Sequence, residues 1–213
     1  MAIPAEYITK IAQMFTQFGI RNITMDYIAR EIGVSKKTLY TWAQNKEELL
    51  SNIIDYILKV ASDDDCENNF KKKPQDFPTA VDAILYVMNN LAHITQNINP
   101  IFMLELNKFY PHLAIKLDDF RYKHIRKKII QNIVRGKREG LYRSDINEEI
   151  ISYFYLGWVT QFSKENMQTI FENKYSNQEI LRELCLFHLN ALLSDKGREY
   201  LKEKITKNKY ENE

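Results

Sequence analysis

Glycine, proline and cysteine are scarce in this sequence: 213 residues contain 6, 5 and 2 of them. So few turn-forming residues argue against β-sandwiches and barrels, and against a glycine-rich phosphate-binding loop. Cys66 and Cys185 lie far apart and lack metal-ligand spacing, so we expect no disulfide framework and a reducing compartment. The formal net charge of +2 excludes a polycationic binder, but it leaves room for a local nucleic-acid surface.

Long apolar runs are missing as well. None approaches the roughly 18 residues that a membrane-spanning helix needs, and the first residues lack the pattern of a signal peptide. We therefore expect a cytoplasmic protein with no membrane partner. The serine-hydrolase, metalloprotease and phosphate-loop motifs are also absent, so we expect no enzyme, no cofactor and no metal. The acidic run Asp63–Asp65 fits a solvated loop over 62–78 better than a metal site.

Apolar residues at helical spacing recur along nearly the whole chain, and 45% of the residues are hydrophobic, which is enough for a core. This pattern predicts an all-α fold without strands. The polar tail from Lys202 onward is expected to fray. The expected helices cover about 4–19, 24–32, 35–42, 46–61, 79–97, 100–110, 111–139, 147–170 and 177–194.

Residues 24–43 have the pattern of a helix-turn-helix (HTH). Ala29 is small enough to let two helices cross closely, and Gly33 can take the left-handed backbone conformation of the turn. Thr24 and Ser35 suit the N-caps. Polar side chains that project from the second helix would then reach bases and phosphates in the major groove. The alternative is a helical hairpin whose polar residues face water. The expected DNA-contacting residues are Thr24, Ser35, Lys36, Lys37, Thr38, Tyr40, Thr41, Trp42 and Lys46.

Residues 8–50 resemble the N-terminal domain of the TetR family of transcriptional regulators. The resemblance implies an N-terminal three-helix DNA-binding domain, 1–45, and a larger helical ligand-binding and dimerisation domain, 46–213. The family usually has Phe at the position of Ala43, so the neighbouring Trp42 either turns inward to supply the missing volume or contacts a phosphate. The matching residues are Ile11-Ala12 to Phe15, Gly19, Thr24-Met25, Ile28-Ala29, Gly33-Val34-Ser35, Leu39-Tyr40 and Lys46-Glu47-Glu48-Leu49.

Two predicted helices of the C-terminal half, 147–170 and 177–194, are apolar on more than one face and must be buried on more than one. One such face suits a homodimer interface, and the resemblance implies a four-helix bundle with the helices of a second copy. The alternative is that both helices simply build the core of one protomer. The interface candidates are Gly157, Gln161, Leu184, Phe187, His188 and Ala191.

Methionine and aromatic residues of the middle helices suit an apolar or cationic small molecule, although such a set more often forms ordinary core. The sequence thus favours a ligand-responsive repressor that binds a near-palindromic operator in double-stranded DNA as a homodimer. The alternative is a helical DNA-binding protein without an effector, which the HTH does not distinguish. The effector-binding candidates are Met88, Phe102, Met103, Phe120, His124, Trp158 and Phe162.

Overall fold

The structure is a computed structural model that describes residues 3–62, 76–96, 99–164, 172 and 174–210. Over these ranges the regular elements are helices, and an isolated bridge pairs Tyr142 with Leu193. The all-α prediction is therefore confirmed. The loop expected over 62–78, with its acidic run, falls mostly outside the described residues.

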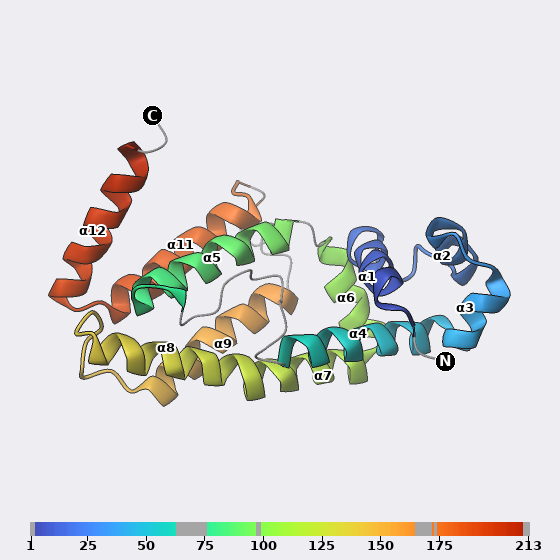
Figure 1. Ribbon diagram of the computed structural model, residues 1–213, viewed down its shortest axis with the longest axis horizontal. Coiled ribbons are helices and arrows are strands. Elements are labelled where there is room, and N and C mark those ends of the chain that lie inside the picture. Colours follow the sequence, from blue (N-terminus) through green and yellow to red (C-terminus); the bar gives the residue numbers. More distant parts are fainter. Residues whose placement is uncertain (1–2, 63–75, 97–98, 165–171, 173, 211–213) are drawn as a thin grey trace. The chain divides into compact units, whose positions relative to one another are not determined.

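The helices over 5–192 follow the predicted ones closely, whereas the last helix, over 195–210, was not predicted; Figure 1 draws them all. The single long helix expected over 111–139 contains a π-helical turn, η2. The elements are α1 (Ala5–Phe18), α2 (Met25–Ile32), α3 (Lys36–Trp42), α4 (Lys46–Ser62), α5 (Ala80–Gln96), α6 (Pro100–Phe109), α7 (Pro111–Phe120), η2 (Arg121–Ile125), α8 (Arg126–Arg138), α9 (Glu148–Lys164), α11 (Asn177–Leu192) and α12 (Asp195–Tyr210).

By its contacts the chain divides into two compact units. The first unit comprises Met1–Asn68, Gln96–Arg121 and Thr160–Asn166, and the second comprises Asn69–Thr95, Tyr122–Val159 and Met167–Glu213. The HTH helices thus share a unit with α4, α6 and α7. The domain boundary expected after residue 45 stays a prediction.

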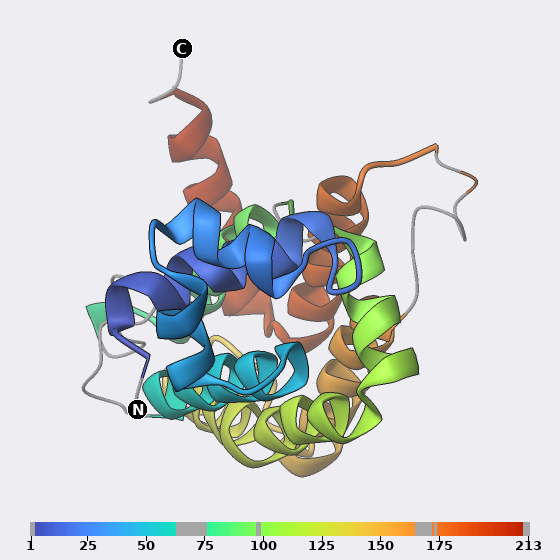
Figure 2. The same cartoon turned by 90° about the vertical axis from the view of Figure 1, so that its right-hand side faces the viewer.

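A continuous apolar core fills the first unit. It joins the inner faces of α1 to α4 to those of α6 and α7, and Figure 2 shows the first three helices in blue with α4 below them. Phe15, Ile28 and Leu39 from the three N-terminal helices are at most 1% exposed. Leu106 of α6 and Leu113 of α7 belong to the same core. The three N-terminal helices are therefore packed on a larger support rather than on one another alone.

The second unit is organised around Tyr142, which follows α8 and is 2% exposed. Its hydroxyl donates to the carbonyl of Ala80 (3.3 Å) and to Oδ1 of Asn132 (3.0 Å), linking α5 and α8. A Cβ at Gly136 would lie 2.1 Å from Cδ2 of Tyr142. Only glycine at position 136 lets this ring lie against α8.

Side chains of α9 and α11 meet in a small polar cluster. Cys185 is 4% exposed and hydrogen-bonds with Tyr155, whose ring centroid lies 5.5 Å from that of His188. Burial raises the pKa of the Cys185 thiol to about 11, and it raises the pKa of Tyr155 as well. Burial lowers the pKa of His188 below its usual 6.5, which favours the neutral imidazole.

The predicted fraying from Lys202 is wrong, since α12 continues to Tyr210. Leu201 is 5% exposed, and the hydroxyl of Tyr200 donates to Oδ2 of Asp82 at 2.6 Å. The Lys204 ammonium pairs with Oδ1 of the same carboxylate at 3.0 Å. The polar composition of this segment does not indicate the contact with α5. The partner residue lies more than a hundred positions away in the sequence, so no local pattern predicts it.

Candidate nucleic-acid interface

The capping residues that the sequence indicated begin both HTH helices. Oγ1 of Thr24 accepts a hydrogen bond from the backbone N–H of Tyr27 at 3.1 Å. Oγ of Ser35 accepts one from the N–H of Thr38 at 3.0 Å. Between the helices, Gly33 has φ 76° and ψ 29°, the left-handed conformation that the turn requires. Local sequence therefore fixes where each helix starts and how the chain turns between them.

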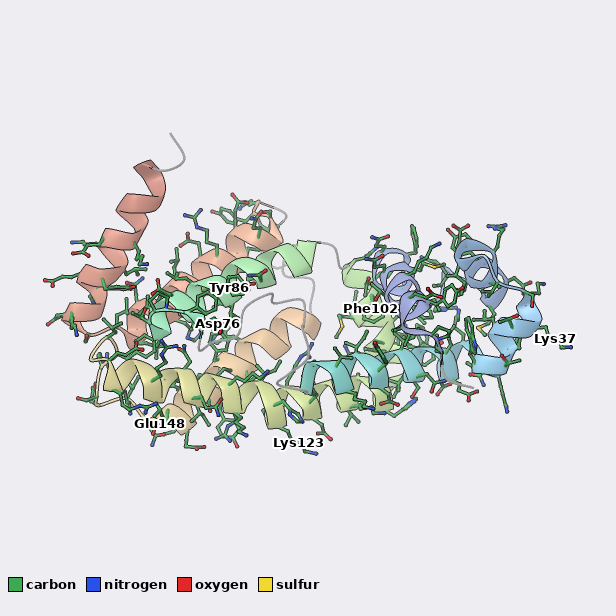
Figure 3. All side chains as sticks on the ribbon, in the orientation of Figure 1. Lys37, Asp76, Tyr86, Phe102, Lys123 and Glu148 are labelled. Atoms are coloured by element: carbon green, nitrogen blue, oxygen red, sulfur yellow. The ribbon has the colours of Figure 1, made fainter. Side chains whose placement is uncertain are left out.

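The inner face of the HTH is apolar and the outer face of α3 is polar. Ala29 and Leu39 are 2% and 0% exposed. Lys37 and Thr41 are exposed, and Tyr40 keeps 47% of its surface accessible. Lys37 points outward from α3 in Figure 3. Because α3 has no acidic residue in its first turn, this face offers lysine and hydroxyl donors to an anion.

Some of the expected contact residues already have partners within the protein. The ammonium of Lys36 lies 2.5 Å from Oδ2 of Asp26 on α2. The hydroxyls of Ser35 and Thr38 are 2.8 Å apart, and Oγ1 of Thr41 donates to the carbonyl of Thr38 at 2.6 Å. These bonds hold side chains of α3 in place, while Lys37 and Tyr40 are exposed to solvent.

Trp42 turns inward into the core, which is one of the two positions expected from the sequence. It is 7% exposed, and its ring stacks on Tyr7 of α1 with the centroids 5.4 Å apart. Ala43 beside it is 2% exposed. The indole therefore supplies the core volume that a phenylalanine at position 43 would otherwise give, and it does not face an incoming phosphate.

Lys46, the first residue of α4, points back toward the α1–α2 loop. Its Nζ donates to the carbonyl of Ile23 at 2.9 Å. Partial burial lowers the pKa of Lys46, although the nearby Glu105 carboxylate opposes that effect. The structure thus gives Lys46 a role inside the protein that sequence reasoning did not foresee.

Glu105 of α6 is a residue that sequence reasoning missed. It is 9% exposed, and its Oε2 accepts from the backbone N–H groups of Ile20 and Arg21. The available signal was a lone carboxylate in the otherwise apolar run Ile101–Leu106. A buried acid needs donors, and here the donors come from the loop before α2.

The expected effector-binding residues are divided between the two units. Phe102 and Met103 belong to the core that supports the HTH, where Figure 3 labels Phe102, and Phe120 is half-buried at the end of α7. Met88 is buried in the second unit, in which Trp158 is 48% exposed.

The π turn η2 breaks the α-helical spacing, so the stripe from Leu113 does not continue to His124, which is exposed. The side chain of Phe162 lies outside the described residues. The effector site stays a prediction.

An apolar stripe on α9 is exposed, as a subunit interface would require. Ile150, Phe154 and Trp158 are 53%, 58% and 48% exposed, and a Cβ added to Gly157 would meet nothing within 4 Å. On α11, Phe187 is 71% exposed and Ala191 is exposed, while Leu184 and His188 are partly covered. The side chain of Gln161 lies outside the described residues.

The described ranges also bear on metal binding and on membrane spanning. There, no cluster of three histidine, cysteine or acidic side chains is arranged to bind a metal ion. Nor does any helix in these ranges combine the length and the apolar composition needed to cross a membrane. Asp63–Asp65 and Cys66 lie outside the described residues.

Comparison with known proteins finds a match over the segment that contains α2 and α3. Residues 8–53 match the family model described as bacterial regulatory proteins, tetR family. A stretch of 45 residues is 49% identical to the uncharacterized HTH-type transcriptional regulator YhgD of Bacillus subtilis. That match covers 21% of this chain and about a quarter (24%) of the relative's length.

Solved structures resemble a larger part of the chain. A tetR-family regulator from Cytophaga hutchinsonii aligns with a TM-score of 0.65 at 14% identity, over 89% of this chain and 94% of its own. AibR, solved in complex with isovaleryl coenzyme A and operator DNA, aligns with a TM-score of 0.55 at 16% identity. That alignment covers 88% of this chain and 96% of AibR. At such identities the likeness is one of fold. The relative and the Cytophaga hutchinsonii protein are both described as transcriptional regulators.

Proposed function

We propose that this chain, whose residues 8–53 match the tetR family of bacterial regulatory proteins, regulates transcription by inserting α3 into the major groove of double-stranded DNA. The observation that carries this proposal is the outer face of α3, where Lys37 and Tyr40 are exposed above a buried apolar face. An α-helix fits the major groove, where lysine reaches base edges and phosphates. The Tyr40 hydroxyl can donate to a phosphate.

The other DNA contacts follow from the positions of the HTH side chains. We propose Thr24, Lys36 and Thr41 as flanking contacts, because these side chains are exposed next to Lys37 and Tyr40. Ser35 and Thr38 position the start of α3 through their mutual hydrogen bond. Trp42 is left out because it is buried. The proposal implies residence in the compartment that holds the DNA, which in a bacterium is the cytoplasm.

We further propose that the regulator is a homodimer joined through α9 and α11. The exposed stripe of Ile150, Phe154 and Trp158, together with Phe187, is a large apolar surface for a protein to leave in water. A two-fold dimer would present two copies of α3 about one or more DNA turns apart. Such a dimer recognises a near-palindromic operator.

A small-molecule effector and a repressor role complete the proposal. The support is the likeness in fold to AibR, which was solved in complex with both isovaleryl coenzyme A and operator DNA. An effector would release the DNA if it bound better to a conformation in which the two recognition helices no longer match the groove spacing.

The experiment that tests the proposal is selection of random duplex DNA by the purified full chain, followed by affinity measurements at several salt concentrations. We expect an inverted repeat to be enriched and binding to weaken steeply with salt, because lysines displace counterions from phosphates. Non-specific binding with no enriched sequence would contradict the proposal. The control is a Tyr40→Ala, Lys37→Ala double variant, which should enrich nothing while keeping its helix content.

A further inference from the structure

The α1–α2 loop, residues 19–23, is held at its start by a side chain of α6. Oε2 of Glu105 accepts hydrogen bonds from the N–H of Ile20 at 2.6 Å and from the N–H of Arg21 at 2.9 Å. Glu105 is 9% exposed, and Ile20 is fully buried. One carboxylate oxygen therefore satisfies two consecutive backbone donors that water reaches poorly.

The close approach of α6 to this loop depends on glycine. Gly19 has φ +83°, and a Cβ there would lie 2.8 Å from Cγ2 of Ile101 and 3.1 Å from Oε2 of Glu105. Any side chain at position 19 would thus push against the residues of α6 that hold the loop. The preceding turn is also bound to α6: the backbone N–H of Asn99 donates to the carbonyl of Thr16 at 2.8 Å.

A second side chain holds the other end of the loop. Nζ of Lys46 donates to the carbonyl of Ile23 at 2.9 Å. The charges of Lys46 and Glu105 attract each other across the loop. The α1–α2 loop is therefore held at both ends. At its start, a carboxylate of α6 accepts from two backbone N–H groups, and at its end, an ammonium of α4 donates to a backbone carbonyl.

Thr24, which caps α2 and is a proposed DNA contact, directly follows this loop. We infer that Glu105 is a positioning residue for DNA recognition: it fixes the loop, and with it the direction in which α2 and then α3 leave the core. The inference rests on the proposed function. Without the negative charge, the two backbone donors lose their charge-assisted acceptor, and the start of α2 is tied less tightly to α6.

The test compares Glu105→Gln with wild type and with Asp119→Asn, which removes the same charge from an exposed position on α7. Operator affinity is measured well below the melting temperature, after titration of the binding-competent fraction. Hydrogen exchange follows the amides of Ile20, Arg21 and Tyr27. We expect Glu105→Gln to lose at least about tenfold in affinity, with faster exchange at these amides, and Asp119→Asn to match wild type.

If Glu105 only stabilised the fold, Glu105→Gln would leave the DNA affinity of the binding-competent fraction unchanged. This affinity therefore separates positioning from stabilisation. Wild-type affinity and unchanged exchange in Glu105→Gln would overturn the inference, and so would wild-type affinity with faster exchange. If Glu105→Gln does not fold, Glu105→Asp keeps the charge but shortens the reach, and it should show the same two changes. If the wild type selects no DNA, the proposed function fails, and the exchange of the Tyr27 amide still decides whether Glu105 sets the start of α2.

Discussion

Gly33 shows how one residue without a side chain shapes the HTH. A Cβ there would meet no atom within 4 Å, so a substitution is resisted by the backbone, whose φ of +76° suits glycine, and not by crowding. We expect Gly33→Ala to lower the free energy of unfolding by about 1–2 kcal/mol. Urea denaturation of the full chain measures this change.

The matched variant at this position is Gly33→Asn, because asparagine tolerates the left-handed region better than alanine does. It should unfold at a urea concentration between those of wild type and Gly33→Ala. Equal midpoints for Gly33→Ala and wild type would mean that the turn relaxes without strain.

Lys37 should contribute to DNA affinity through charge. We expect Lys37→Ala to weaken binding and to reduce the slope of log affinity against log salt by about 1, because one phosphate contact is lost. The control is Lys127→Ala on α8, where the lysine is equally exposed. An unchanged salt slope in Lys37→Ala would remove this residue from the proposed interface.

At this scale the sequence predicts a residue's role when the determining neighbours are local. Thr24, Ser35 and Gly33 act within their own turns, so their roles are legible from spacing. Glu105 and Lys46 act on backbone atoms that lie 84 or 85 and 23 positions away, respectively. Spacing does not report such contacts, and a phosphate contact was the natural expectation for a lysine at a helix start.

The C-terminal helix α12 is an element that its own composition does not explain. Its attachment to α5 passes through the Asp82 carboxylate, which receives the Tyr200 hydroxyl and the Lys204 ammonium. Partial burial alone would raise the pKa of Asp82, but the hydrogen bonds from Tyr200, Thr79 and Lys204 outweigh it and lower the pKa below the usual 3.8. The hydrogen bond to Asp82 raises the pKa of Lys204 above 10.5.

The directions of these two pKa shifts define the pH range in which Asp82 and Lys204 stabilise the attachment of α12. The stabilisation from Asp82 is complete above its unfolded pKa, near 4, and is lost as the pH falls through the lower folded value. That from Lys204 is complete below 10.5 and is lost as the pH rises through its higher folded value. We expect amide exchange in α12, corrected for the intrinsic pH dependence of exchange, to stay constant between these limits and to accelerate in stronger acid.

Replacement of the shared carboxylate tests the same attachment at neutral pH. Asp82→Asn should lower the free energy of unfolding by about 1 kcal/mol, since the pair is partly exposed, and it should speed exchange in α12 selectively. Glu203→Gln, an exposed change on the same helix, is the comparison. Identical exchange in the two variants would show that the Asp82 carboxylate does not hold α12.

Helix boundaries were predictable for most elements because proline, glycine and capping residues mark them. Pro100 and Pro111 begin α6 and α7, and Gly19 and Gly33 follow the ends of α1 and α2. The π turn between α7 and α8 has no such marker. It moves His124 off the apolar stripe that a regular helix would have continued.

For the whole molecule, the proposed dimer makes a prediction about size. The wild type should sediment with twice the mass of one chain, and Phe187→Asp should sediment as a monomer. The Phe187 ring is 71% exposed, so the substitution should leave the melting of the protomer nearly unchanged. Arg182→Ser, an exposed change on the same helix, should remain dimeric. A monomeric wild type would contradict the proposed dimer. A dimeric Phe187→Asp would show that the dimer interface does not include Phe187.

Packing between segments that are distant in the chain was the feature of the fold that the sequence predicted least well. Helical periodicity predicts that α6 and α7 are buried on one face, but it does not say that this face joins the core of the DNA-binding helices. Phe102 illustrates the difference: its size suggested an effector site, and the structure places it in that core. Long-range packing of this kind leaves no local pattern.

Chemical modification of the buried Cys185 thiol would report how often the second unit opens. With a pKa near 11, roughly one molecule in ten thousand carries a thiolate at neutral pH, and thiolates are the species that alkylating reagents attack. In a Cys66→Ser background, iodoacetamide would therefore modify the protein only when α9 and α11 separate. The labelling rate would then measure how often this unit opens, and how far a bound partner suppresses the opening.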